Sequence, residues 1–121
     1  MKLKTDRIKE FKEMFNLLYK GLQEKPEISL NFDADRITIK ELDNSNISMG
    51  ILNLNKSFFY EYETEPLNIG LNLNDFTEVL KRFDNKDFLE ITLNNNDLII
   101  NKINNDFKTE FKLKTLEIEN K

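Results

Sequence analysis

The stretch EISLNFDADRITIK (residues 27–40) alternates apolar and polar residues, breaks at Asp33, Ala34 and Asp35, and then alternates again. Such a pattern is typical of two antiparallel β-strands joined by a tight turn. The stretch EITLNNNDLIINK (residues 90–102) repeats the pattern around an Asn-rich break. The sequence therefore predicts two similar hairpins in a chain of only 121 residues.

An amphipathic helix pattern precedes each hairpin. Before the first hairpin, apolar residues recur every three or four positions, at Ile8, Phe11, Phe15, Leu18 and Leu22. Before the second hairpin, the same spacing joins Phe76, Val79, Leu80 and Phe83. This spacing places apolar side chains along one side of a helix. We expect Asp6 to cap the first helix and Asn74 or Asp75 to cap the second.

The order of the predicted elements recurs along the chain. We expect short strands at residues 2–5 and 67–71, ahead of the helices, and further strands at residues 46–55 and 107–116, after the hairpins. Aligning helix with helix and hairpin with hairpin gives an offset of about 63 to 65 residues, as expected of an internal repeat. We therefore predict one α+β domain of two β-α-β-β-β repeats, residues 1–57 and 66–118, with eight strands on one side of two helices.

Composition excludes several classes of protein. The chain contains no Cys and no His, and its formal net charge is −4. The lack of both residues removes thiol chemistry and the commonest general base and metal ligand. No apolar run approaches the roughly 20 residues that span a bilayer, and the N-terminus lacks the apolar core of a signal peptide. We therefore expect an intracellular protein that lacks most catalytic templates and makes no membrane contact.

Three further segments follow one another in a recognisable order. LDNSNI (residues 42–47) matches a Met-Asp-x-Ser-His-Val segment, with Asn46 in place of the His. FYEY (residues 59–62) matches Phe-x-x-Tyr, and GLNLNDFTEVLK (residues 70–81) matches Gly-x-x-Leu-x-x-(Leu/Met)-x-x-(Ile/Val)-Leu-Lys. With these motifs in this order, the chain resembles the N-terminal domain of proliferating cell nuclear antigen (PCNA), the archaeal and eukaryotic sliding clamp.

The resemblance implies a non-enzymatic DNA-clamp domain, with no cofactor and no metal ion, that serves a DNA polymerase as a processivity factor. It would act in the cytoplasm or nucleoid, or in a eukaryotic nucleus. It implies non-specific contact between double-stranded DNA and the polar side of both helices, through Lys9, Lys12, Asn16, Lys20, Thr77 and Lys81. It implies part of a pocket for clamp-binding partner peptides at Leu42, Asn46 and Ile47. It also implies a subunit edge that pairs with another clamp domain, through Phe107, Thr109, Phe111 and Leu113.

Other interpretations of the same residues stay open. A polar helix side with several lysines is also typical of any solvated helix. Because the second clamp domain of the family is absent from this sequence, the chain is interpreted either as an N-terminal domain or as a half-length clamp. A half-length clamp could form a ring, or it could regulate a full clamp by capping its interface or sequestering its partners.

Two local clusters carry alternatives of their own. Asp33, Asp35 and Asp43 form a candidate carboxylate cluster for a metal-dependent nuclease, although turns favour Asp for local hydrogen bonds. The aromatic segment FFYEY (residues 58–62) could stack on the bases of single strands. Its acidic neighbours instead favour a packed crossover between the two repeats.

Overall fold

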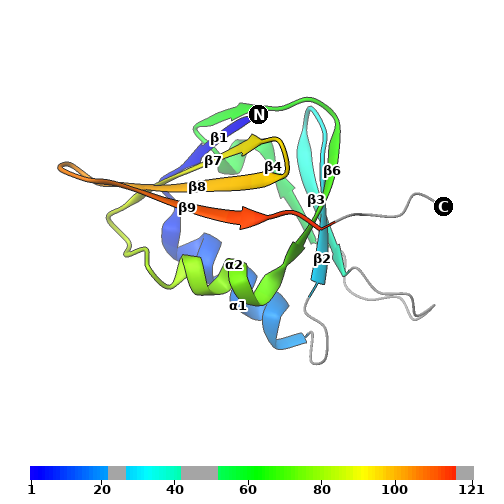
Figure 1. Ribbon diagram of the computed structural model, residues 1–121, viewed down its shortest axis with the longest axis horizontal. Helices are drawn as coiled ribbons and strands as arrows, with labels where there is room; N and C mark the ends of the chain where they lie inside the picture. Colours follow the sequence, from blue (N-terminus) through cyan, green and yellow to red (C-terminus); the bar gives the residue numbers. More distant parts are fainter. Residues whose placement is uncertain (22–26, 42–51, 117–121) are drawn as a thin grey trace.

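The computed structural model of the protein describes residues 1–21, 27–41 and 52–116 (Figure 1). In chain order its strands and helices are β1 (Lys2–Thr5), α1 (Ile8–Gly21), β2 (Glu27–Phe32), β3 (Arg36–Glu41), β4 (Leu52–Asn55), β5 (Glu61–Glu63), β6 (Leu67–Asn72), α2 (Leu73–Leu80), β7 (Phe88–Asn94), β8 (Asp97–Ile103) and β9 (Lys108–Lys114). A 3-10 turn (Lys56–Phe58) follows β4. The order strand, helix, strand, strand, strand thus occurs twice, with β5 between the two copies.

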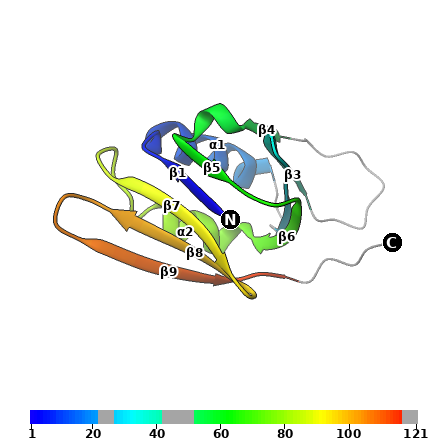
Figure 2. The same ribbon diagram turned by 90° about the horizontal axis from the view of Figure 1, so that it is seen from above.

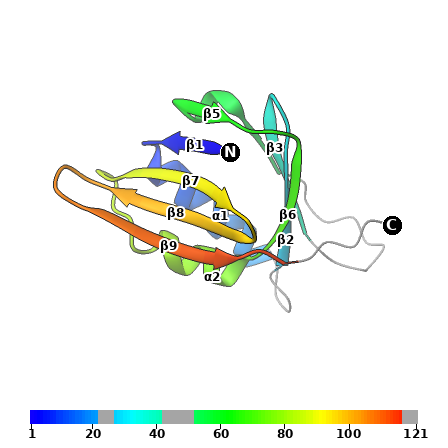
Figure 3. The same cartoon turned by 45° about the horizontal axis from the view of Figure 1, so that its top comes forward.

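The strands form two antiparallel sheets that exchange strands between the two halves of the chain. One sheet has the order β5-β1-β7-β8-β9, and the other has the order β4-β3-β2-β6. The first strand of each half therefore pairs with the hairpin of the other half: β1 with β7, and β6 with β2. Figures 2 and 3 show the two sheets meeting at an angle, with the end of β9 passing beside β6. A single core results, because neither half can form its sheet alone.

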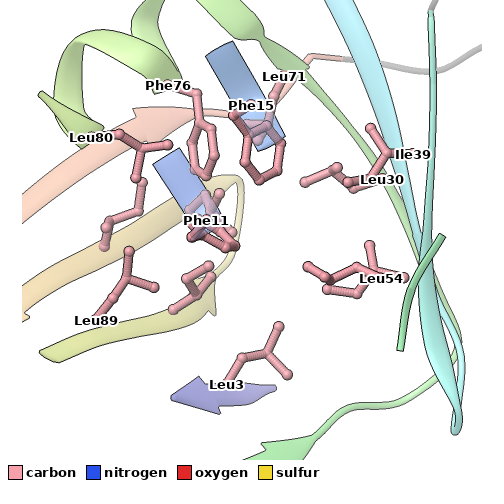
Figure 4. Close-up of a cluster of buried hydrophobic side chains, with 14 of the residues drawn as sticks. Leu3, Phe11, Phe15, Leu30, Ile39, Leu54, Leu71, Phe76, Leu80 and Leu89 are labelled. Carbon is pink, nitrogen blue, oxygen red and sulfur yellow. The ribbon is translucent and has the colours of Figure 1, made fainter. Parts of the chain in front are cut away.

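Both helices pack against this core from one side (Figures 1 and 4). Phe76 of α2 packs against Phe15 and Phe11 of α1, with ring centroids 4.8 and 6.1 Å apart. Leu3, Leu30 and other strand residues complete the same buried cluster. The prediction of an α+β domain is confirmed. The described residues form nine strands in two sheets, one strand more than predicted, because β5 pairs with β1.

The predicted hairpins occur, with β2 and β3 joined at Asp33 and with β7 and β8 joined by a two-residue turn at Asn95 and Asn96. Asp33 Oδ1 accepts hydrogen bonds from the backbone N–H groups of Asp35 and Arg36, at 2.8 and 2.9 Å. Asn95 adopts φ 57°, in the left-handed region that Asn tolerates better than most residues. Both breaks in the sequence are therefore turns, as predicted.

The helix caps differ from the predicted ones. At α1, the Thr5 hydroxyl oxygen accepts from the backbone N–H of Arg7, the residue before the helix, at 3.1 Å, and no hydrogen bond to the Asp6 side chain is found among the described residues. At α2, Asn72 is the N-cap and accepts from the N–H of Asp75, so the helix begins two or three residues earlier than predicted. Of the predicted strand at residues 46–55, the described part is β4, and the remainder lies outside the described residues.

Candidate functional site

The two helices lie side by side and run in opposite directions. Near the start of α1, Lys12 Nζ donates a hydrogen bond to the carbonyl of Phe83, just beyond the end of α2, at 2.7 Å. Near the end of α1, Tyr19 Oη donates to Asn74 Oδ1, in the first turn of α2, at 2.9 Å. These two contacts fix an antiparallel pair whose outer side faces away from the sheets (Figure 1).

Four of the six predicted DNA-contacting residues are exposed on the helix pair: Lys9, Asn16, Lys20 and Lys81. Lys81 forms an ion pair with Glu78 at 2.8 Å, and both side chains are more than half exposed. The hydrogen bond to the Glu78 carboxylate raises the pKa of Lys81, and the same bond lowers the pKa of Glu78. The positive charge of Lys81 is therefore partly neutralised by its neighbour.

The other two predicted DNA contacts, Thr77 and Lys12, are less accessible. Thr77 is only 4% exposed, and its hydroxyl donates to the carbonyl of Asn74 at 3.0 Å. Thr77 thus lies on the inner side of α2, where it cannot contact a ligand bound outside. Lys12 is half-buried, and its ammonium group donates a hydrogen bond to the carbonyl of Phe83. This carbonyl lies beyond the C-terminus of α2, where the helix dipole favours a cation. The role that the structure supports for Lys12 is to join the helices.

Sequence reasoning missed two residues of this helix pair. Tyr19 joins α1 to α2, and Leu17 is 71% exposed. Both flank Leu18, a member of the apolar stripe. Because neither lies at the three- or four-residue spacing of that stripe, the sequence pattern did not identify them. Glu10 and Glu13 are also exposed on α1, which weakens the positive field of the helix pair.

The predicted subunit strand is an edge strand, as predicted, because β9 pairs with β8 at the end of the five-stranded sheet. Its predicted contact residues divide into two groups. Phe111 and Leu113 are half-buried against the core, and the Phe111 ring lies 6.3 Å from that of Phe83. Thr109 is exposed, and Phe107 is 70% exposed at the tip of the β8–β9 hairpin. The role of these residues in assembly stays a prediction.

Of the candidate carboxylate cluster, the structure describes Asp33 and Asp35, which lie in the same turn. Asp33 is held in the first turn by two backbone N–H donors, and these bonds lower its pKa. The carbonyl of Asp33 also accepts the hydroxyl of Tyr62 at 2.6 Å, and burial raises the pKa of Tyr62 to about 12. Asp43 lies outside the described residues. Among the described residues no group of three or more carboxylates is placed to hold a metal ion.

The aromatic segment at residues 58–62 is a packed crossover, as predicted. Phe59 is buried, and Phe58 packs against the core with its ring centroid 5.9 Å from that of Phe11. The Arg7 guanidinium lies over the Phe58 ring, 4.4 Å from its centroid. In the part of the chain that the structure describes, neither helix is long and apolar enough to cross a membrane.

Comparison with known proteins identifies the family. Residues 4–121 match the sequence model of "Proliferating cell nuclear antigen, N-terminal domain". The chain belongs to the PCNA family. Among curated relatives, the DNA polymerase sliding clamp of Methanosarcina acetivorans is 34% identical over 67 residues, which cover 55% of this chain and 27% of that protein. DNA polymerase sliding clamp 1 of Thermococcus kodakarensis is 28% identical over 109 residues, 89% of this chain and 44% of that protein.

Solved PCNA structures share the fold. The crystal structure of PCNA from Thermococcus kodakaraensis gives a TM-score of 0.84 at 24% identity, covering 99% of this chain and 48% of that chain. One chain of the PCNA2-PCNA3 complex from Sulfolobus tokodaii gives a TM-score of 0.85 at 23% identity, with the same coverage. The chain thus spans less than half the length of these PCNA relatives.

One predicted PCNA site is not placed by the structure. Leu42, Asn46 and Ile47, the predicted part of the partner-peptide pocket, lie outside the described residues. The two remaining surfaces, the helix pair and the β9 edge, lie close together where β9 passes beside α2 (Figures 1 and 3), but they are formed by different elements and different side chains. They can therefore be tested separately.

Proposed function

We propose that this protein is a DNA sliding clamp, or the N-terminal domain of one, and that it raises the processivity of a DNA polymerase without catalysing a reaction. The observation that carries the proposal is the family match across residues 4–121, together with the clamp-domain fold. In this proposal the helix pair lines a channel around double-stranded DNA, and β9 joins the domain to a neighbouring clamp domain. Its action on chromosomal DNA would place it in the cytoplasm or nucleoid, or in a nucleus.

The helix pair suits weak contact with phosphates. Lys9, Lys20 and Lys81 are exposed, and none of them belongs to a buried or multiply bonded network among the described residues. Lysine contacts to phosphates carry no sequence information and are weakened by salt. Glu78, at 2.8 Å from Lys81, competes with phosphate for one of these charges. A clamp that slides requires such weak contacts, since its retention comes from encircling the DNA.

The open edge of β9 suits assembly. A strand at the end of a sheet leaves half of its backbone N–H and C=O groups available for another strand. The neighbouring domain would continue the five-stranded sheet, and a head-to-tail contact of this kind can close into a ring. The partner peptides of a clamp, including those of the polymerase, would dock in the pocket that the resemblance assigns to Leu42, Asn46 and Ile47.

The test is topological retention on DNA. The native assembly, purified from its own cells through a tag on this chain, is incubated with nicked circular duplex and then passed over a sizing column in high salt. We expect the protein to coelute with circular DNA and to be released when the circle is linearised. Equal release from circular and linear DNA would contradict the clamp proposal.

The open edge also fits the regulatory alternative, because a single added strand would block the interface of a full clamp. A regulator and a clamp differ in the same experiment. A regulator would reduce the retention of the cell's full-length clamp on circular DNA and would not itself remain on the circle. A clamp would remain on the circle.

A further inference from the structure

The hydrogen bonds at the two ends of β9 show which of its residues face the open edge. Asn104 N–H donates to the carbonyl of Phe107 at 3.0 Å, and Thr115 N–H donates to the carbonyl of Asn96 at 2.8 Å. In an antiparallel pair, hydrogen-bonded positions alternate with positions whose N–H and C=O groups point away. The odd-numbered residues from Phe107 to Thr115 therefore bond to β8. The even-numbered residues present their backbone groups to the open edge, and these are Lys108, Glu110, Lys112 and Lys114.

These four side chains give the edge a defined charge pattern. All four are exposed, and they carry three positive charges and one negative charge along one side of the strand. Lys112 Nζ lies 3.7 Å from Glu110 Oε2, and both side chains are at least half exposed, so this pair is weak. Lys108 and Lys114 form no ion pair with any described residue. The edge is therefore strongly positive except at Glu110.

Glu110 is the last member of a row of polar side chains that crosses the whole sheet. The register places Glu61, Lys4, Glu90, Asn101 and Glu110 opposite one another on five successive strands. Lys4 Nζ lies 3.8 Å from Glu61 and 3.7 Å from Glu90, and Glu90 Oε1 accepts from Asn101 Nδ2 at 2.9 Å. Asn101 is only 4% exposed, yet its Oδ1 has no hydrogen-bond donor among the described residues. The row thus ends with an unused buried acceptor beside a carboxylate.

The next position of this row would belong to a strand added to β9. Strands lie about 4.8 Å apart, so a residue opposite Glu110 would be roughly 10 Å from Asn101. The side chain of Lys or Arg can extend over Glu110 across most of that distance, pair with its carboxylate and donate to Asn101 Oδ1. Unpaired buried acceptors destabilise a protein, so this donor would contribute more than an exposed ion pair alone.

We propose that β9 recruits an edge strand of another polypeptide, one with Asp or Glu opposite Lys108, Lys112 and Lys114 and with Lys or Arg opposite Glu110. This inference rests on the proposed function, in that β9 is taken as the strand through which the domain assembles. Cross-strand pairs of opposite charge stabilise a sheet, and like charges placed opposite one another destabilise it. The charge pattern of β9 therefore selects its partner.

A second copy of this chain fits the pattern poorly. The longest antiparallel pairing of two β9 strands, centred on Phe111, would place Glu110 opposite Lys112 twice but also Lys108 opposite Lys114 at both ends, so it satisfies only half of the pattern. An in-register parallel pairing would place every charge opposite its like. Among the other edges that the structure describes, β4 and β6 carry no acidic residue. Only β5 is acidic, through Glu61 and Glu63, and it is three residues long. A different polypeptide with a longer acidic edge is the better match.

The experiment titrates the full chain, labelled with nitrogen-15, with two peptides at low salt. The acidic peptide is Glu-Thr-Glu-Thr-Arg-Thr-Glu, and the control is its charge reversal, Lys-Thr-Lys-Thr-Glu-Thr-Lys. Each is also made with the reverse sequence, so that parallel and antiparallel strands are both represented. We expect the acidic peptide to shift the amide signals of the four outward residues and to bind at least about 10-fold more tightly than its control.

Two variants make the test specific. Reversing all four charges (Lys108→Glu, Glu110→Lys, Lys112→Glu, Lys114→Glu) should reverse the peptide preference. Lys112→Pro removes an outward N–H without removing a bond to β8, so it should abolish binding while the melting temperature changes little.

The remaining outcomes separate this inference from the clamp proposal. Equal binding of both peptides, lost in the Lys112→Pro variant, would overturn the charge pattern while leaving β9 as an assembly strand. Failure of both peptides to bind, or self-association of the chain alone that is tighter than peptide binding, would overturn the proposed partner. The clamp function would still be decided by retention on circular DNA.

Discussion

Replacing Lys12 with Met should destabilise the domain more than it weakens DNA binding. Met keeps most of the apolar stem of the side chain but cannot donate a hydrogen bond. The carbonyl of Phe83, which now accepts from Lys12 Nζ at 2.7 Å, would lose this donor at the end of α2. The substitution therefore removes the one hydrogen bond described between the first half of α1 and the chain that follows α2.

The size of the effect follows from this contact. A hydrogen bond to a charged group contributes about 1.5–3 kcal/mol, and partial exposure of Lys12 favours the lower end of that range. A cation at a helix C-terminus adds about 0.3–1 kcal/mol. We expect a loss of about 2 kcal/mol in the free energy of unfolding. For a domain of this size, that loss corresponds to a decrease of about 7 °C in melting temperature.

The assay is urea unfolding followed by circular dichroism, with Lys9→Met as the matched control. Lys9 is exposed on the same helix, so its substitution should change the free energy of unfolding by less than about 0.5 kcal/mol. In the assembled ring the order should reverse: Lys9→Met should lower the salt dependence of DNA binding by about one phosphate contact, and Lys12→Met should lower it less. The reasoning is refuted if Lys12→Met unfolds at the same urea concentration as the parent chain.

Three further predictions concern single contacts. Tyr62→Phe should lessen the loss of stability between about pH 10 and pH 12, measured by urea titrations. The raised pKa keeps Tyr62 protonated in the folded state while the unfolded state ionises, so the free energy of unfolding falls as the pH rises. An identical pH profile in the variant would contradict this. Asn95→Ala should lower the free energy of unfolding by about 1 kcal/mol because Asn95 has a positive φ, whereas Asn95→Gly should not lower it. Equal losses in the two variants would show that backbone strain is not the cause. Glu78→Gln should strengthen DNA binding by the assembled ring, because it frees Lys81 from its ion pair. Fluorescence anisotropy measures the affinity, and an unchanged affinity would exclude Lys81 as a DNA contact.

The elements that could be predicted from the sequence are those that depend on neighbours along the chain. Strands β2 and β3 begin and end within a residue of their predicted bounds, because their alternation and the Asp33 turn are local signals. The stripe from Ile8 to Leu18 likewise located α1. The Asn95 turn followed from the same kind of local chemistry.

The features that escaped prediction depend on residues far apart in the sequence. The exchange of β1 and β6 between the two sheets joins strands from opposite halves, and alternation alone cannot say which strand is the neighbour. Lys12 was predicted from its position on a polar helix side, but its bond to a carbonyl 71 residues away could not be read from that position. Thr77 was assigned to the same side, although its hydroxyl can bond within its own helix and so tolerate burial.

The strand exchange also explains why one small domain can offer both candidate surfaces. Because β1 and β6 each belong to the sheet formed by the other half of the chain, each helix follows a strand of one sheet and precedes the hairpin of the other sheet. Both helices are thereby brought to the same side of the domain, where their exposed residues can form one surface. The last strand of the second half is left at the end of its sheet, with its outward backbone groups available to a neighbour. A repeat without the exchange would separate the two helices, and the domain would lose the continuous helical side on which the proposed channel depends.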